Sequence, residues 1–149
     1  MSTYLYFFFG TLMDLDVLAL VLERPVQQAE LEPAHMDGYA RVYAKNEWYP
    51  VLVPDADGAV DGFLMEIEQK DVDRIAHFED DDYTVDPLMV TGKRRGQVEA
   101  LVHLHSKGEM PTDKPWDIDT WRRRHKVRFL EMSQAWMDGS DYWPGVGED

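Results

Sequence analysis

The stretch YLYFFFGTLM, Tyr4–Met13, carries large apolar side chains through Phe9 and then changes character at Gly10-Thr11-Leu12. Apolar residues at consecutive positions predict a strand that is covered on both of its faces. Asp14 follows the turn and predicts the start of a helix that runs to about Glu23. The turn has two interpretations: an ordinary strand-to-helix connection, or a main-chain cradle for a small polar ligand.

The composition limits the class of protein. Because domains of about 100–150 residues are the commonest, we expect the 149 residues to form one domain, 1–149. The chain has no cysteine, which excludes disulfides, thiolate metal sites and a cysteine nucleophile. Its net charge of −14 disfavours nucleic acid as a partner, since a negative surface repels phosphate.

Hydropathy predicts where the protein is found. No segment reaches the roughly 20 apolar residues of a membrane span. The first charged residue is Asp14, so the N-terminus lacks the basic start of a signal peptide. We therefore expect a cytoplasmic protein without a membrane partner, as a monomer or a homodimer.

Periodicity and turn residues divide the remaining chain into short elements. Strands are predicted over Gln28–His35, Tyr39–Ala44, Tyr49–Val53, Ala59–Ile67, Tyr83–Thr91 and Gln97–Leu104. Further predictions are turns at Asp37-Gly38 and Asp55–Gly58, a loop over Lys107–Pro115, and helices over Lys70–Phe78 and Asp119–Met137. Short strands with inserted helices predict an α+β fold with a mixed, barrel-like sheet. Its core covers about residues 4–105, and a long C-terminal helix forms an extension over about 117–138.

Glu79 is the carboxylate that stands out. At about 100° per residue, Glu79 returns to the face of the helix that carries Val72, and it lies four residues after Ile75. A carboxylate directed toward an apolar stripe has a raised pKa, which suits a group that exchanges protons near neutral pH. The alternative is that the helix frays and Glu79 turns into solvent with the three acids that follow it.

The order of these features resembles the γ-glutamylcyclotransferase superfamily, which includes the avirulence-induced-gene-like proteins. The similarity rests on FFGTLM, GYARVY, a Tyr-Pro pair, GAVDGFLMEI and IAHFEDDDYTVDPLMV, between Tyr4 and Leu104. The resemblance implies that Glu79 is the general acid/base. It also implies a set of substrate-binding residues: Phe9, Gly10, Thr11, Leu12, Tyr39 (after Gly38), Tyr49, Pro50 and Tyr83.

The implied reaction is the cyclisation of a γ-glutamyl amine or peptide to 5-oxoproline with release of the amine. The resemblance implies a small-molecule γ-glutamyl substrate and no metal or organic cofactor. Two departures bear on substrate choice. Phe9 stands where the family usually has tyrosine, and Thr84 and Val85 occupy the neighbourhood of a usual arginine.

Other chemical groups have simpler interpretations. His103 and His105 lie two apart on a strand and form a possible metal pair, but we expect strand histidines that face solvent or a polar neighbour. His125 is expected to be a hydrogen-bonded core residue. Asp14 and Asp16 could bind a cation, although helix capping explains Asp14. Arg122-Arg123-Arg124 is expected to be an ion-paired, solvated helix face.

The last predicted helix carries an apolar stripe, Trp121, Phe129, Met132 and Trp136, which we interpret as core packing. A lid over a cavity and a homodimer contact are the alternatives. Two rival functions stay open. One is a non-catalytic member of the fold that binds a small metabolite or a protein, and the other is an enzyme that acts on a different γ-glutamyl amine or related amide.

Overall fold

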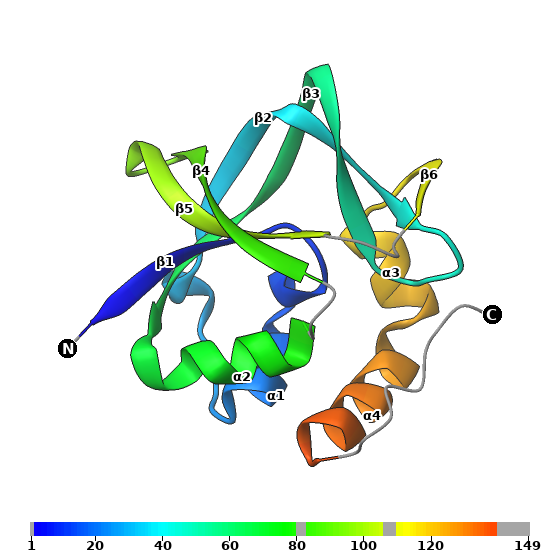
Figure 1. The fold of residues 1–149 in the computed structure, drawn as a ribbon. Coiled ribbons are helices and arrows are strands. Elements are labelled where there is room, and N and C mark those ends of the chain that lie inside the picture. The colour runs from blue at the N-terminus through cyan, green and yellow to red at the C-terminus, as the bar shows by residue number, and fades with distance from the viewer. Residues whose placement is uncertain (1, 80–82, 106–109, 140–149) are drawn as a thin grey trace.

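The computed structural model describes residues 2–79, 83–105 and 110–139 (Figure 1). The strands are β1 (Thr3–Phe8), β2 (Glu32–Ala44), β3 (Pro50–Glu68), β4 (Tyr83–Gly92), β5 (Gly96–His105) and β6 (Pro111–Pro115). The helices are α1 (Leu15–Leu22), α2 (Gln69–Glu79), α3 (Ile118–Arg124) and α4 (Lys126–Met137), with the short 3₁₀ turns η1 (Thr11–Met13) and η2 (Gln28–Glu30).

The strands form one six-stranded sheet that closes on itself. Its order is β3-β1-β5-β4-β2-β6, and an additional pairing of β3 with β2 completes a ring. The β1–β5 pair is parallel, while the other pairs are antiparallel. A closed sheet leaves few free edges. The prediction of an α+β fold with a mixed, barrel-like sheet is confirmed.

Strands β2 and β3 are longer than the sequence predicts. The predictions of turns at Asp37-Gly38 and at Asp55–Gly58 are wrong, because both segments lie within these strands. Both strands continue through these points, because β2 and β3 pair over most of their length. Gly38 has a φ of +91° and lies at a shift of register between Asp37 and Tyr39, which marks a β-bulge. A Cβ atom on Gly58 would lie 2.5 Å from the Tyr39 carbonyl oxygen, so the second glycine permits close strand contact.

The two faces of β1 are both covered, as its sequence predicts. Tyr6 and Phe8 pack in a core cluster that is shared with α1, α2 and α4, whereas Phe7 and Phe9 pack in a second cluster made by the strands. Figure 1 shows α1 and α2 together on one side of the sheet. The helical layer therefore covers one face of β1, and the interior of the barrel covers the other.

The helix expected over Asp119–Met137 is divided in two. His125 ends α3 and has non-helical angles, φ −129° and ψ −16°. Its buried ring stacks on Trp48 at 4.4 Å between centroids, so tertiary contact explains a break that no proline or glycine marks. The predicted core stripe of Trp121, Phe129, Met132 and Trp136 is buried. In the described part of the chain, no helix has the length and hydropathy to cross a membrane.

Two smaller expectations are also corrected. The predicted strand Gln28–His35 begins as η2, and only its second half belongs to β2. The predicted loop Lys107–Pro115 contains β6, which pairs with β2. Residues 106–109 of that loop lie outside the described residues, as do the acids at 80–82 and residues 140–149.

Candidate active site

The turn after β1 is built by two main-chain hydrogen bonds. Met13 N donates to the Gly10 oxygen at 2.9 Å, and Asp14 N donates to the Thr11 oxygen at 3.1 Å. The N–H groups at the start of such a turn have no partner within it. Thr11 and Leu12 are buried, and Gly10 is half-buried. The turn therefore holds the main-chain N–H groups at its start in a fixed position directly after β1.

Pro50 lies directly against this turn. A Cβ atom on Gly10 would lie 3.1 and 3.2 Å from the Pro50 ring carbons, which is closer than ordinary van der Waals contact. Gly10 and Pro50 are forty residues apart in the sequence, and the structure places them in contact. A larger residue at position 10 would displace the proline or the turn.

Asp14 holds the other end of the turn. Its carboxylate caps α1 by accepting from the N–H groups of Asp16 and Val17, and it also accepts from Arg122 Nε at 2.9 Å and Lys126 Nζ at 3.1 Å. Burial alone would raise the pKa of the Asp14 carboxyl, but these donors outweigh burial and the pKa is lowered. Capping is confirmed, and the cations near Asp14 are two side chains of the C-terminal helices.

The arginine run is an exposed, ion-paired helix face as predicted, and one of its members has a further contact. Arg122 is ion-paired as expected, and it also pairs with Asp119 at 3.6 Å. Its stronger partner is the buried carboxylate of Asp14, 108 residues earlier. The run is not only a solvated face, because one member attaches α3 to the start of α1.

Glu79 is the last residue of α2 and is half-buried. Burial raises the pKa of its carboxyl to about 8. The preceding residue, Phe78, packs in the same core cluster as Leu12 and Met13. Glu79 is therefore not a freely solvated carboxylate, and its helix ends in the layer that contains the turn.

The end of α2 is fixed by a second contact. Trp136 Nε1 donates to the His77 main-chain oxygen at 2.8 Å, and the two rings stack at 4.9 Å with an interplanar angle of 8°. This contact attaches α4 to the residue two positions before Glu79. Like Asp14, Glu79 therefore has its position set partly by the C-terminal helices.

The other predicted residues lie in different surroundings. The ring of Phe9 is buried in the strand-lined cluster, against which the half-buried Tyr39 packs. Tyr49 is half-buried and packs against the helical cluster. Tyr83 is the first residue of β4, and its side chain is outside the described part of the structure. For Phe9 it is the main-chain carbonyl, not the ring, that lies at the turn.

Arg41 is a site residue that sequence reasoning missed. Its Nη1 donates to the Phe9 oxygen at 2.9 Å and to the Asp61 oxygen at 2.7 Å, and its Nε donates to the Trp116 oxygen at 3.3 Å. Arg41 lies within the GYARVY motif, but nothing in the motif identifies three main-chain carbonyls as its partners.

Of the two surroundings expected for His103, solvent or a polar neighbour, the structure shows the second. His103 is buried and stacks on Tyr6 at 5.7 Å between centroids, so it does not face solvent. Burial lowers the pKa of its imidazole to about 4 and raises the pKa of the Tyr6 hydroxyl, which keeps both groups neutral at pH 7. The side chain of His105 lies outside the described residues, among which no group of three potential metal ligands occurs.

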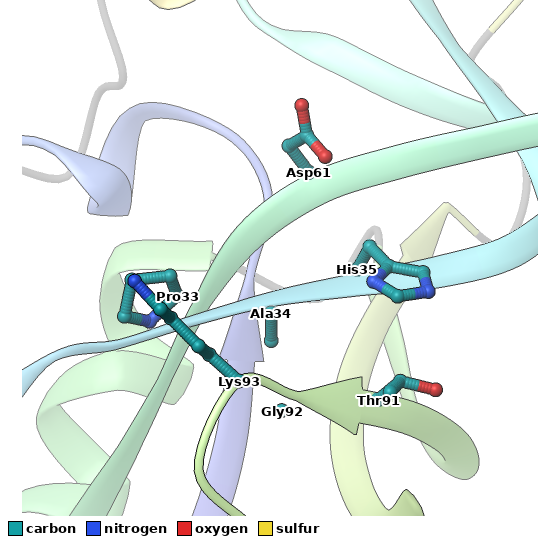
Figure 2. A pocket seen from close by; sticks show the side chains of 7 residues that line it. All are labelled: Pro33, Ala34, His35, Asp61, Thr91, Gly92 and Lys93. Carbon is teal, nitrogen blue, oxygen red and sulfur yellow. The ribbon is translucent and has the colours of Figure 1, made fainter. Parts of the chain in front are cut away.

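A groove of about 310 Å³ lies elsewhere, where β3, β2 and β4 meet (Figure 2). Its lining residues are Pro33, Ala34, His35, Asp61, Thr91, Gly92 and Lys93. None of the predicted site residues lines it. In Figure 2 the polar ends of Asp61, His35 and Lys93 point in different directions, so the groove does not gather its polar groups around one point.

Comparisons with known proteins bear on this arrangement. A model of the family described as gamma-glutamyl cyclotransferase, AIG2-like, matches residues 6–123. The chain is similar to AIG2-like protein A of Arabidopsis thaliana, at 26% identity over 147 residues that cover 96% of this chain and 87% of that protein. It is also similar to Protein AIG2 C of the same plant, at 27% identity over 136 residues that cover 89% and 80%.

Solved structures show the same fold. A solution structure of an Arabidopsis thaliana protein has a TM-score of 0.66 and 22% identity, covering 95% of this chain and 87% of that one. A structure titled "Gamma-glutamyl cyclotransferase" has a TM-score of 0.59 and 11% identity, covering 97% and 94%. At these identities, the structures establish the fold and not the activity.

Proposed function

This chain belongs to the gamma-glutamyl cyclotransferase, AIG2-like family, and from that premise we propose that it cyclises a γ-glutamyl amine or γ-glutamyl peptide to 5-oxoproline. Glu79 is the general acid/base in this proposal. The main-chain N–H groups of Gly10, Thr11 and Leu12 bind the substrate, and Tyr39, Tyr49, Pro50 and Tyr83 line or shape the site. The substrate is a small molecule.

The proposed reaction is intramolecular. The α-amine of the substrate attacks its own γ-carbonyl carbon, forming the ring C–N bond, and the bond from that carbon to the leaving nitrogen then breaks. The α-ammonium loses two protons as it becomes the ring N–H, and the leaving nitrogen gains two and departs as an ammonium. Glu79 carries protons between the two nitrogens, so no water or co-reactant is consumed. Because both reacting groups belong to one molecule, holding it in a folded conformation supplies much of the rate.

The observation that carries the proposal is the state of Glu79. A carboxyl with a pKa of about 8 is protonated in most molecules at pH 7 and can both accept and return a proton. An exposed carboxylate would be too weak a base for this exchange. The turn after β1 also supports the proposal. Main-chain N–H groups such as those of Gly10, Thr11 and Leu12 lower the activation barrier when they donate to an oxyanion that develops in the transition state.

The test is turnover by a Glu79→Gln variant, which keeps the shape of the side chain and removes proton exchange. Wild type and variant are incubated with a panel of γ-glutamyl amines and dipeptides, and release of 5-oxoproline is measured. We expect the variant to lose turnover while its thermal unfolding shows a folded protein. Asp73→Asn, on the exposed part of the same helix, is the matched control and keeps full activity.

Undiminished turnover by Glu79→Gln would exclude Glu79 from the mechanism. Absence of turnover by the wild type on the whole panel would favour a non-catalytic binding protein of the same fold.

A further inference from the structure

The ladder between β1 and β3 stops before the turn. Its last pair is Phe8 with Phe63. Two further steps in the same antiparallel register would place Gly10 opposite Asp61, and the N–H of Gly10 would then meet the Asp61 carbonyl. The chain does not continue this way. Among the described residues, no acceptor receives a hydrogen bond from Gly10 N.

The carbonyl that would close this next pair is bound by Arg41. Nη1 of Arg41 reaches the Asp61 oxygen at 2.7 Å and the Phe9 oxygen at 2.9 Å. A side chain from β2 therefore occupies the place where β1 would pair with β3. It satisfies two carbonyls that otherwise need main-chain donors, and the cost of ending the ladder is reduced.

Arg41 is itself held in one position. Its Nε donates to the Trp116 oxygen at 3.3 Å, the N–H of Trp116 donates to the Arg41 oxygen at 3.2 Å, and the guanidinium lies 5.5 Å from the centre of the Trp116 ring. Trp116 is buried, and its Nε1 donates to the Trp48 oxygen at 2.8 Å. Trp116 therefore holds the Arg41 guanidinium in place, while Nη1 of the same guanidinium contacts the Phe9 oxygen.

The hydrogen bond from Arg41 to the Phe9 oxygen also affects the N–H group of Gly10. The carbonyl of Phe9 and the N–H of Gly10 belong to one planar trans peptide, so they point in opposite directions. Arg41 therefore fixes the direction of the Gly10 N–H. A cation bound to the carbonyl polarises the peptide and makes its N–H a stronger donor. Burial lowers the pKa of the Arg41 guanidinium, and the charges of Asp61 and Asp117 act in the opposite direction.

We propose that Arg41 is a positioning residue, which ends the β1–β3 ladder at Phe8 and keeps the Gly10 N–H free, oriented and polarised for an oxygen of the substrate. The proposal rests on the proposed function for the identity of that oxygen, the developing oxyanion or the carboxylate of a γ-glutamyl group. The ending of the ladder by Arg41 is a structural statement that is tested separately.

The structural test observes one amide. The dipeptide Phe-Gly occurs once in the sequence, at Phe9-Gly10, so ¹³C-carbonyl phenylalanine combined with ¹⁵N-glycine selects the Gly10 amide in an NMR spectrum. In the wild type we expect rapid hydrogen exchange. In Arg41→Met we expect the ladder to extend to Asp61, with slower exchange and a downfield shift of the amide proton. Arg41→Lys keeps one cationic donor and is expected to remain close to the wild type.

The kinetic test separates positioning from general stability. Loss of one oxyanion donor typically lowers kcat by about 10²–10³-fold, and we expect a fall in kcat of about 10²-fold for Arg41→Met. Arg74→Met is the matched control. Arg74 is also half-buried and donates to a main-chain carbonyl, that of Val21, but it links α2 to α1 and not to the turn. Its variant is expected to keep kcat within about twofold while losing comparable stability.

Two results would overturn the role of Arg41. One is an unchanged Gly10 amide in folded Arg41→Met, and the other is an equal loss of kcat in Arg41→Met and Arg74→Met. If the wild type shows no turnover of any γ-glutamyl compound, the proposed function fails. The exchange of the Gly10 amide then still decides whether Arg41 ends the ladder.

Discussion

Replacing Asp14 by asparagine tests how the turn is held. The amide side chain of this Asp14→Asn variant keeps an oxygen that can cap α1, but it loses the negative charge that faces Arg122 and Lys126. The Asp14 side chain is only 2% exposed, whereas those of Arg122 and Lys126 are 41% and 24% exposed. The substitution therefore removes two charge-assisted hydrogen bonds at a buried atom and leaves both cations within reach of water.

The expected loss of stability follows from these contacts. A hydrogen bond to a charged group contributes about 1.5–3 kcal/mol, and breaking a buried ion pair costs about 3–5 kcal/mol. Because both cations are partly exposed and become hydrated, we expect a loss of about 2–3 kcal/mol in the free energy of unfolding. For a chain of this size, this loss lowers Tm by roughly 5–10 °C.

The assay is urea unfolding from pH 7 to pH 3. The folded-state pKa of Asp14 is lowered, so its contribution is complete above the unfolded-state pKa of about 3.9 and is lost as pH falls through the folded-state pKa. The difference between wild type and Asp14→Asn should be constant from pH 7 to about pH 5 and shrink below about pH 4.

The matched control is Asp16→Asn. Asp16 also pairs with Lys126, at 2.7 Å, but is 69% exposed, so its loss should cost less than about 1 kcal/mol. Equal losses in the two variants, or a difference for Asp14→Asn that does not change with pH, would refute the assignment of a buried ionic contact.

Two further predictions concern the base and the C-terminal helices. If Glu79 acts as the ionised base with a pKa of about 8, kcat/KM rises with pH from 6 to about 8 and then levels; a profile that is flat from pH 6 to 8 would contradict this role. Trp121 is fully buried in the helical cluster, so Trp121→Ala should lower the free energy of unfolding by about 3–5 kcal/mol in one cooperative transition. A separate transition for the C-terminal helices would contradict the prediction of a single domain.

The parts of the fold that the sequence predicts are those in which local pattern and tertiary contact agree. The apolar run of β1, the α2 stripe that ends at Glu79 and the β4–β5 hairpin all have local signals that the structure follows. The Asp-Gly signals within β2 and β3 were overridden because these two strands pair on both sides of them, and the ladder skips Asp55–Gly58 opposite Gly38. Turn-forming residues indicate only a local conformational preference. The pairing of strands far apart in the sequence decides whether a turn or a continuous strand forms.

The candidate site shows the same division. Gly10 and Glu79 have local sequence patterns from which a role can be inferred, whereas Pro50 is implied only by the family resemblance. The role of Arg41 has no sequence signal, because its partners are main-chain oxygens of residues 20 to 75 positions away. For His103 the alternation of β5 leaves solvent and a polar neighbour open, and only the tertiary contact with Tyr6 decides between them.

The orientation of the turn cannot come from the turn alone. A single 3₁₀ turn closed by two hydrogen bonds is not stable without tertiary contacts. Here the contacts come from Pro50, from Arg41 and, through Asp14, from Arg122 and Lys126. The family match ends at residue 123, before Lys126 and before Trp136, which holds the end of α2. The C-terminal helices, predicted as an extension of a core at about residues 4–105, are thus part of the frame that fixes both the amide donors and the proposed base.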